Sequence, residues 1–440
     1  MIAGVLLTEV FLAGVLASGR VSIALWVFVA ALCVAFAFRY PMLTAVATLV
    51  LGASVFYSEL FAVSIGPLNA NGPEVLLGAL FVVAVTRPQR RGLGGIAGAG
   101  LLAFLVIVGI SILLAVNEGT TEILNAFSWS RAYLTFVFFF VIVRLFSDRE
   151  SLRRLLFWAT MISAVTGFVA VYLSLLGGPE SFFQDPSQQF IKSEEGLGII
   201  QRVRLPGLSL AYALYWYAVV KTIRYHGRER LLWGLAVVGM SLNIVVSFNR
   251  NMWIGIVIGL PVLLALAGPQ VRRRLAGTLA VAAFALVLIG AQPGPESKLS
   301  PLIARGTTLT NRGSLLAEAS IQSRENETEI AWGVAKRNLL TGIGPGVQFG
   351  AEFFEATAQG VWVKVPQYFL HNQYLYILLI AGIPALLAFL VFLLASVRSA
   401  FARGTRTAES AAWGVGLVSI MLSAIVAIYF SDTDMIFAIA

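Results

Sequence analysis

The stretch HNQYLYILLIAGIPALLAFLVFLLAS, residues 371–396, is the clearest indication of the fold class of this chain. It contains no Asp, Glu, Lys or Arg, and after its polar first residues it is almost entirely apolar. A helix needs roughly 20 apolar residues to cross the hydrocarbon core of a membrane. The stretch therefore predicts a transmembrane helix whose polar mouth begins at His371.

The rest of the chain has the same character. Of its 440 residues, 58% are hydrophobic and 12% are charged, whereas a soluble protein carries about 25% charged residues. We therefore predict an all-α integral membrane protein, a single polytopic domain over residues 1–440 with about 12 to 14 transmembrane helices. The apolar spans cover residues 2–18, 21–38, 42–57, 73–86, 95–116, 130–146, 155–176, 207–223, 231–248, 252–268, 275–291, 372–396 and 411–430.

Basic residues gather in every second loop. The clusters lie at residues 87–91, 144–154, 221–230, 272–274 and 398–406. Cytoplasmic loops of membrane proteins are enriched in Lys and Arg, so we place these five loops in the cytoplasm. The net charge of +9 then reflects topology, and we expect no nucleic-acid partner. By alternation, the outer side receives residues 58–72, 117–128, 177–206, 249–251 and 292–371.

The outer loop at 292–371 is far longer than a connection between two helices needs to be. Loops of this length in compact proteins tend to carry function. Residues 324–340 have helical character, and the glycines of 342–346 would end a helix. We expect one or two short helices on the outer membrane surface, followed by a glycine-rich turn.

His371 is the first candidate for chemistry. An ionisable side chain at the mouth of a membrane helix is costly unless it has a role, and imidazole is well suited to moving protons near neutral pH. The alternative is an interfacial residue hydrogen-bonded to a neighbour. The other histidine, His226, lies in a predicted cytoplasmic loop, and Cys33 is the only cysteine. We therefore predict no metal site, and His371 remains as a lone general base or as a donor to an anionic group.

Arginines occur at two other outer helix mouths. Arg250 lies in the short loop at 249–251, and Arg202 and Arg204 precede the span at 207–223. Each of Arg204 and Arg250 either anchors the helix to lipid headgroups or binds a phosphate, which the planar guanidinium fork fits well. Arg202 fits a surface charge better. Together with His371 they suggest a phosphorylated, lipid-anchored substrate, and the glycines of 342–346 lack the lysine of a nucleotide-binding loop.

Three stretches resemble bacterial O-antigen ligases and polymerases. The stretch Ser247–Gly255 is similar to the short arginine-containing loop of that family, and Ala331–Gly346 is similar to the segment before its catalytic histidine. The run His371–Leu375, followed by Ala381–Ile383, resembles its His-Asn helix start and the glycine that follows. The resemblance covers about residues 200–396 in detail, which we predict to be the catalytic region. Asn338–Leu340 departs from it, since the family often has a proline there.

The resemblance implies a helical C-type glycosyltransferase fold in the bacterial inner membrane, with the active site facing the periplasm and 292–371 as a large periplasmic loop. The donor would be a glycan on undecaprenyl pyrophosphate, and the acceptor a sugar hydroxyl of lipid A-core for a ligase or a second lipid-linked glycan for a polymerase. Membrane lipids would surround the spans, and no cofactor or metal is implied. Carried over by position, Arg204 and Arg250 would bind the pyrophosphate and His371 would act on the acceptor. The lesser candidates for contacts to glycan or phosphate are Asn372, Arg202, Arg312 and Arg324.

A transporter or lipid flippase is the alternative from another class. Such a protein would carry ionisable residues near the centres of its spans and an inverted repeat. The sequence shows neither clearly, because its outer ionisable groups gather at helix mouths.

Overall fold

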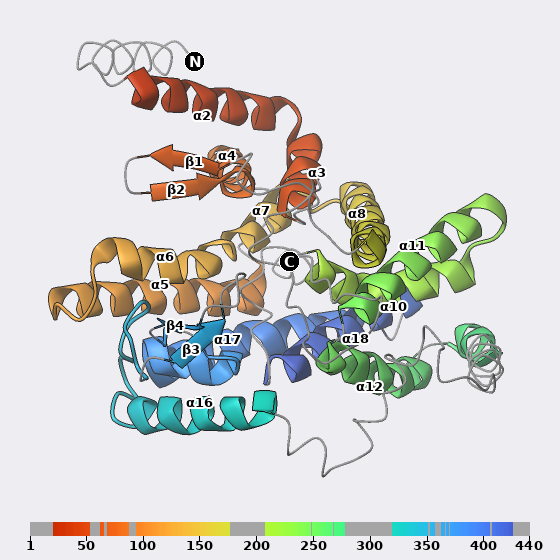
Figure 1. The fold of residues 1–440 in the computed structure, drawn as a ribbon. Helices are drawn as coiled ribbons and strands as arrows, with labels where there is room; N and C mark the ends of the chain where they lie inside the picture. Colours follow the sequence, from red (N-terminus) through yellow and green to blue (C-terminus); the bar gives the residue numbers. More distant parts are fainter. Residues whose placement is uncertain are drawn as a thin grey trace.

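The structure is a computed structural model of the whole chain, shown in Figure 1. It describes residues 21–52, 62–65, 68–87, 94–176, 207–247, 249–266, 268–277, 319–350, 353–356, 362–365, 367–368, 370–404 and 407–425.

Helices make up almost all of the described chain. The N-terminal part contains α2 (Val21–Arg39), α3 (Pro41–Gly52), α4 (Gly72–Thr86), α5 (Gly95–Asn117), α6 (Ile123–Leu134), α7 (Val137–Leu145) and α8 (Arg149–Leu176). The C-terminal part contains α10 (Leu208–Arg224), α11 (Gly227–Val246), α12 (Arg250–Leu266), α16 (Ala319–Ala335), α17 (Gln373–Gly404) and α18 (Ala408–Ser423). The predicted all-α class is confirmed.

Two short antiparallel hairpins were not predicted. One pairs β1 (Ala62–Ile65) with β2 (Leu68–Asn71), and the other pairs β3 (Phe353–Ala356) with β4 (Trp362–Val365). Both fall in loops that the sequence places on the outer side. Strands of four residues are too short to leave a clear alternation in the sequence.

Several helices have the length and composition of membrane spans. Within the described part, four qualify: Gly95–Asn117, Arg149–Tyr172, Gly227–Val246 and Gln373–Ala402. α6 and α7 form a pair bent by 43° that would count as a fifth span. The shorter apolar helices are Phe28–Arg39, Pro41–Gly52, Gly72–Thr86, Asn251–Ala265 and Ala408–Ser423. The chain is thus a multi-pass membrane protein. The predicted span at 2–18 and nearly all of that at 275–291 lie outside the described residues, so the total of 12 to 14 stays a prediction.

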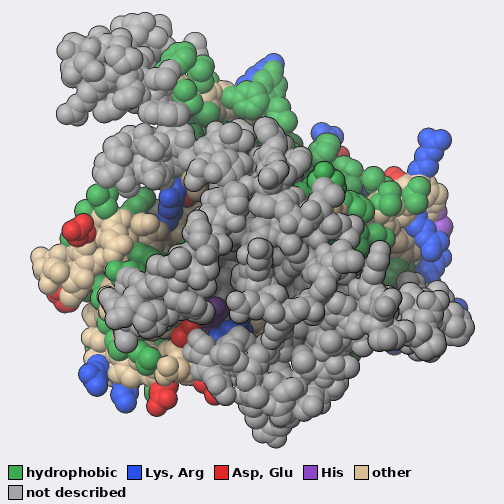
Figure 2. Space-filling view, in the orientation of Figure 1, with side chains coloured by type: hydrophobic (Ala, Val, Ile, Leu, Met, Phe, Trp, Pro, Cys, Tyr) green, Lys and Arg blue, Asp and Glu red, His purple; other side chains and the backbone are tan. Residues whose placement is uncertain are grey.

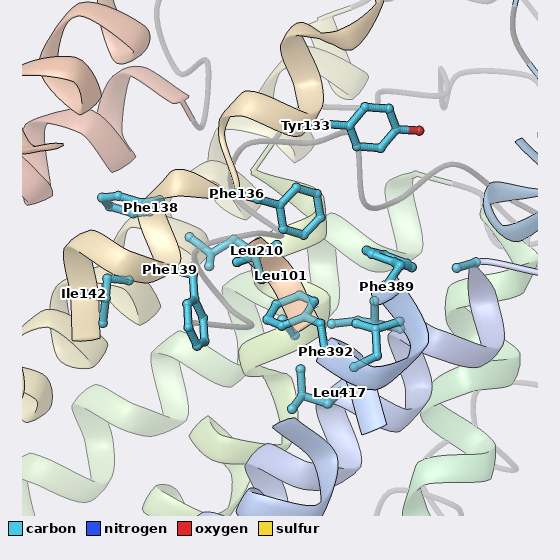
Figure 3. Packing of buried hydrophobic residues seen from close by; sticks show 14 of the residues in the cluster. Leu101, Tyr133, Phe136, Phe138, Phe139, Ile142, Leu210, Phe389, Phe392 and Leu417 are labelled. Atoms are coloured by element: carbon cyan, nitrogen blue, oxygen red, sulfur yellow. The ribbon is translucent and has the colours of Figure 1, made fainter. Parts of the chain in front are cut away.

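An aromatic core fastens α17 to the N-terminal half of the protein. Phe104 of α5 lies with its ring centroid 5.1 Å from Phe389 of α17, and Phe136 lies 5.9 Å from Phe392. All four side chains are buried, and Figure 3 shows Phe136, from the junction of α6 and α7, beside Phe389 and Phe392 of α17. Offset and edge-on ring pairs add about 0.5–1.5 kcal/mol each to the burial of apolar area. This core holds the helix whose first turn follows His371.

Glycines allow other helices to approach closely. A Cβ on Gly167 of α8 would lie 1.7 Å from the carbonyl oxygen of Gly239 in α11. Gly255 and Gly259 of α12 leave room in the same way for Tyr212 and Trp216 of α10. Lipid tails are as apolar as leucine side chains, so membrane helices associate through close backbone contact of this kind.

Arginines of three basic clusters bond to the C-terminal ends of helices. Arg87, Arg144 and Arg274 donate to carbonyl oxygens in the last turns of α2, α4 and α10, at 2.8, 3.0 and 2.8 Å. Carbonyls at helix C-termini lack partners within the helix and carry partial negative charge, so cations stabilise them. Figure 2 shows basic side chains gathered over the α10–α11 turn, away from the mixed charges over α16. His371 lies at the other end of α17 from the basic cluster at 398–406.

Candidate functional site

His371 is paired with an acidic side chain from another helix. Its Nδ1 atom lies 2.8 Å from Oε2 of Glu327 in α16. The imidazole is 37% exposed and the carboxylate side chain 18% exposed. The pair is therefore partly buried, and part of the imidazole surface remains accessible.

The local sequence explains why α17 starts directly after this histidine. Asn372 accepts a hydrogen bond from the backbone N–H of Leu375 at 3.0 Å through Oδ1. Asparagine is a favoured N-cap because this bond satisfies one of the N–H groups that lack a partner in the first turn. His371 thus occupies the last position before the cap, where its side chain can reach α16.

α18 holds the first turn of α17 in place. The backbone N–H of Gln373 donates to the carbonyl oxygen of Ala424 at 3.0 Å, and the hydroxyl of Tyr374 donates to that of Met421 at 2.9 Å. Both acceptors lie at the C-terminal end of α18. The position of His371 therefore depends on a helix that follows it in the chain.

The same end of α18 also contacts the start of α12, where Arg250 is the first residue. Ser423 donates through its hydroxyl to the carbonyl oxygen of Asn251 at 3.5 Å. Trp253 fixes the corner between α11 and α12, because its indole N–H donates to the carbonyl oxygen of Ile244 at 3.0 Å. The N-termini of α12 and α17 thus meet one turn of α18, which brings the backbones at Arg250 and His371 to a common end.

α16 packs along α17 through one narrow face of its surface. Ala331 and Ala335 are fully buried and follow Glu327 at intervals of four residues, so the three share one face of the helix. Figure 1 shows α16 running beside α17. The helical character predicted for 324–340 is confirmed over 324–335, whereas residues 336–340 form turns after the end of α16. The small-residue face of α16 packs against protein.

The glycine-rich turn after α16 docks into a break in α17. At Gly382 the backbone has φ 76° and ψ −177°, and Pro384 follows without an N–H group. The N–H groups of Ile343 and Gly344 donate to the carbonyls of Leu379 and Ile380 at 2.8 and 3.0 Å. In return, the N–H of Ile383 donates to Leu339 at 2.7 Å. The break frees these backbone groups, and the turn satisfies them.

A buried polar cluster lies under the first turn of α17. Gln373 is fully buried and donates through Nε2 to the hydroxyl of Tyr133 at 3.1 Å. Its Oε1 atom and the hydroxyl of Tyr376 have no hydrogen-bond partner among the described residues. Nothing in the amino-acid order pointed to this cluster, because tyrosine at a helix mouth is a common interfacial residue.

The structure describes only some of the predicted site residues. Arg324 lies on α16, three residues before Glu327, and is half-buried. Arg250 is placed by its backbone, and its side chain lies outside what the structure describes. Arg202, Arg204 and Arg312 lie outside the described residues. The roles of these residues, and the boundaries 292–371 and 200–396, stay predictions.

Glu327 was missed by the sequence reasoning. A signal was present: it is the acidic residue in phase with Ala331 and Ala335, the small residues of the helix that precedes the glycine turn. A carboxylate beside an imidazole fixes which ring nitrogen carries the proton. Among the residues that the structure describes, no group of three His, Cys, Asp or Glu side chains is placed to hold a metal ion.

One comparison with known proteins bears on this site. Residues 235–390 match a family described as O-antigen ligase. The match includes α12, α16, His371 and the first part of α17, so it contains both members of the imidazole–carboxylate pair. No curated protein matches the chain.

Proposed function

We propose that the protein is a glycosyltransferase that moves a glycan from undecaprenyl pyrophosphate to a sugar hydroxyl of lipid A-core, because residues 235–390 match a family described as O-antigen ligase. The observation that carries the proposal is the position of His371. It lies inside the matched segment, at the start of α17, half-exposed and at the opposite end of that helix from a basic cluster.

The proposed location is the bacterial inner membrane, with His371 on the periplasmic side. The basic clusters support this orientation, because they favour the cytoplasm for the other ends of the helices. A donor on undecaprenyl pyrophosphate brings its own energy in the pyrophosphate bond, so transfer on the periplasmic side needs no nucleotide.

In the proposed reaction His371 takes the proton of the acceptor hydroxyl. The oxygen forms a bond to C1 of the donor sugar as the bond from C1 to the pyrophosphate oxygen breaks, with inversion at C1. Undecaprenyl pyrophosphate leaves with the electron pair. General-base catalysis of this kind contributes roughly 10²–10⁴-fold to a rate.

Negative charge grows on the leaving pyrophosphate, and we assign its stabilisation to Arg204 and Arg250. The start of α12 supports this role for Arg250, since the N–H groups of a helix N-terminus favour an anion. Arg202, Arg312 and Arg324 are proposed to contact glycan or phosphate on the strength of the resemblance. Asn372 is proposed likewise, although its side-chain oxygen caps α17.

The test is transfer by purified protein in liposomes that contain the lipid-linked glycan and lipid A-core. His371→Ala should lower the rate at least about 100-fold. His226→Ala is the matched control, because it removes the other histidine, in the loop between α10 and α11, and should keep the rate of the unchanged protein. Near-normal transfer by His371→Ala would remove the assignment. Loss of transfer on chelation with EDTA would contradict the proposal that arginines stabilise the pyrophosphate without a metal ion.

A polymerase would use the same site with a second lipid-linked glycan as the acceptor. A deletion strain separates the two activities. Long polymer that stays on undecaprenyl pyrophosphate indicates that a ligase is missing, and lipid A-core capped with single repeats indicates that a polymerase is missing.

A further inference from the structure

Glu327 is set apart from the other acidic residues of α16. Its side chain is 18% exposed and reaches His371. Glu325 and Glu329 are exposed to solvent and lie on other faces of the same helix. The contact is thus particular to one position of the helix, and it does not arise from a general excess of acidic residues near the histidine.

Packing and backbone hydrogen bonds hold α16 and the turn after it against α17. Ala331 and Ala335 pack without exposure on the face that Glu327 shares. Beyond them, the N–H groups of Ile343 and Gly344 bond to α17 at 2.8 and 3.0 Å. α16 therefore meets α17 along its length and through the turn that follows it. The packed backbone already places Glu327 next to the imidazole, so the contact costs the rotamer freedom of the side chain but no further backbone freedom.

The contact selects one nitrogen of the ring. An ionised carboxylate can accept hydrogen bonds but cannot donate them. In the neutral ring, Nδ1 must then carry the hydrogen that lies between it and Oε2 of Glu327, 2.8 Å away. The lone pair that can take up a proton is consequently on Nε2.

We propose that Glu327 is a positioning residue that holds His371 in the tautomer with Nδ1 protonated, so that Nε2 accepts the proton of the substrate hydroxyl. The inference rests on the proposed role of His371 as a base. During the step, Nε2 gains the proton, the acceptor oxygen bonds to C1, and the pyrophosphate leaves with the electrons of the broken bond. Glu327 stays ionised and stabilises the imidazolium. The imidazolium afterwards returns the proton to solvent.

The first test reads the tautomer directly and needs no substrate. The chain has two histidines, so a His226→Gln background leaves His371 as the single imidazole in a ¹⁵N solid-state NMR spectrum of protein in liposomes. At a pH where the ring is neutral, we expect a protonated Nδ1 and an unprotonated Nε2. Glu327→Ala should shift the population towards protonated Nε2. Glu329→Ala, which removes an exposed carboxylate from the same helix, should leave the spectrum unchanged.

The second test measures transfer. The carboxylate that orients the imidazole of a serine-protease triad contributes about 10⁴-fold to kcat. Since the pair described here is partly exposed and screened by water, we expect Glu327→Ala to lower kcat about 10- to 100-fold with KM nearly unchanged. Glu327→Gln keeps the shape of the side chain, but its amide can donate to Nδ1 and so favour the other tautomer. Its kcat should therefore fall at least as far as that of Glu327→Ala.

Failure of the positioning role is distinct from failure of the proposed function. An unchanged tautomer in Glu327→Ala, or the same kcat as in Glu329→Ala, would overturn the role of Glu327 even if His371→Ala is inactive. Full transfer by His371→Ala would instead remove the base itself. Glu327→Gln guards against misfolding, because it preserves the shape of the side chain.

Discussion

Replacing Gly382 with alanine should detach the glycine turn from α17. The backbone at Gly382 has φ 76° and ψ −177°, a region that residues other than glycine occupy only with strain. An added Cβ would also lie 2.5 Å from the carbonyl oxygen of Leu340 and 2.8 Å from that of Leu339. The methyl group and the docked turn cannot share this space.

The magnitude follows from the strain and from the bonds that the turn makes. The backbone conformation costs a non-glycine residue about 1–3 kcal/mol. If the turn undocks, three backbone hydrogen bonds, between Leu379 and Ile343, Ile380 and Gly344, and Leu339 and Ile383, are lost at about 0.5–1.5 kcal/mol each. The docked arrangement should therefore lose roughly 3–7 kcal/mol.

Two assays report this loss. Thermal unfolding of purified protein in detergent should show a lower midpoint. Trypsin should cleave faster at Lys336 and Arg337, which are exposed and lie between α16 and the turn. Transfer activity should fall as well, because α16 carries Glu327 to His371. Cleavage is followed by mass spectrometry at a temperature well below the midpoint.

Gly333→Ala is the matched control. Gly333 lies in α16 with nothing within 4 Å of an added Cβ, and alanine is the better helix former by about 1 kcal/mol. This variant should keep or raise the midpoint. An unfolding midpoint and a cleavage rate for Gly382→Ala equal to those of the unchanged protein would refute the docking of the turn.

Two further predictions concern the packing of the helices. Gly167→Ala should abolish the monodisperse peak in size-exclusion chromatography, because its Cβ would lie 1.7 Å from a carbonyl oxygen of α11. Gly109→Ala, with open space around an added Cβ, should behave normally. Lys221→Ala should destabilise the protein by about 2–4 kcal/mol, because this ammonium is 3% exposed and lies 2.9 Å from Glu409. Arg224→Ala removes a 47% exposed partner of the same carboxylate and should cost at most about 1 kcal/mol in thermal unfolding.

Most helices could be predicted from hydropathy because each span is a local property of roughly 20 residues. The predicted spans at 95–116 and 231–248 correspond to α5 and α11. The span at 130–146 was predicted as one helix, and the structure divides this region between α6 and α7. Two helices at 43° have the same composition as one straight helix, so hydropathy could not show the bend.

Only one residue of the imidazole–carboxylate pair could be predicted from the sequence. His371 was recognisable from its residue type and its place before an apolar stretch, and the resemblance to O-antigen ligases around it agrees with the family match. Its partner Glu327 lies 44 positions away, among other acidic residues with similar sequence surroundings. Which of them faces the histidine depends on how α16 packs on α17.

The order of residues alone is enough to predict a helical membrane protein with a histidine at the mouth of its longest apolar stretch. Apolar length and charge asymmetry fix these properties, because transfer into lipid is a sum over neighbouring residues. The tertiary structure decided which helices touch, that the glycine turn fills the break at Gly382, and that Glu327 holds His371. Lipid solvates an apolar helix face as well as another helix does, so these contacts depend on close packing and hydrogen bonds that residues distant in the chain form only when folded.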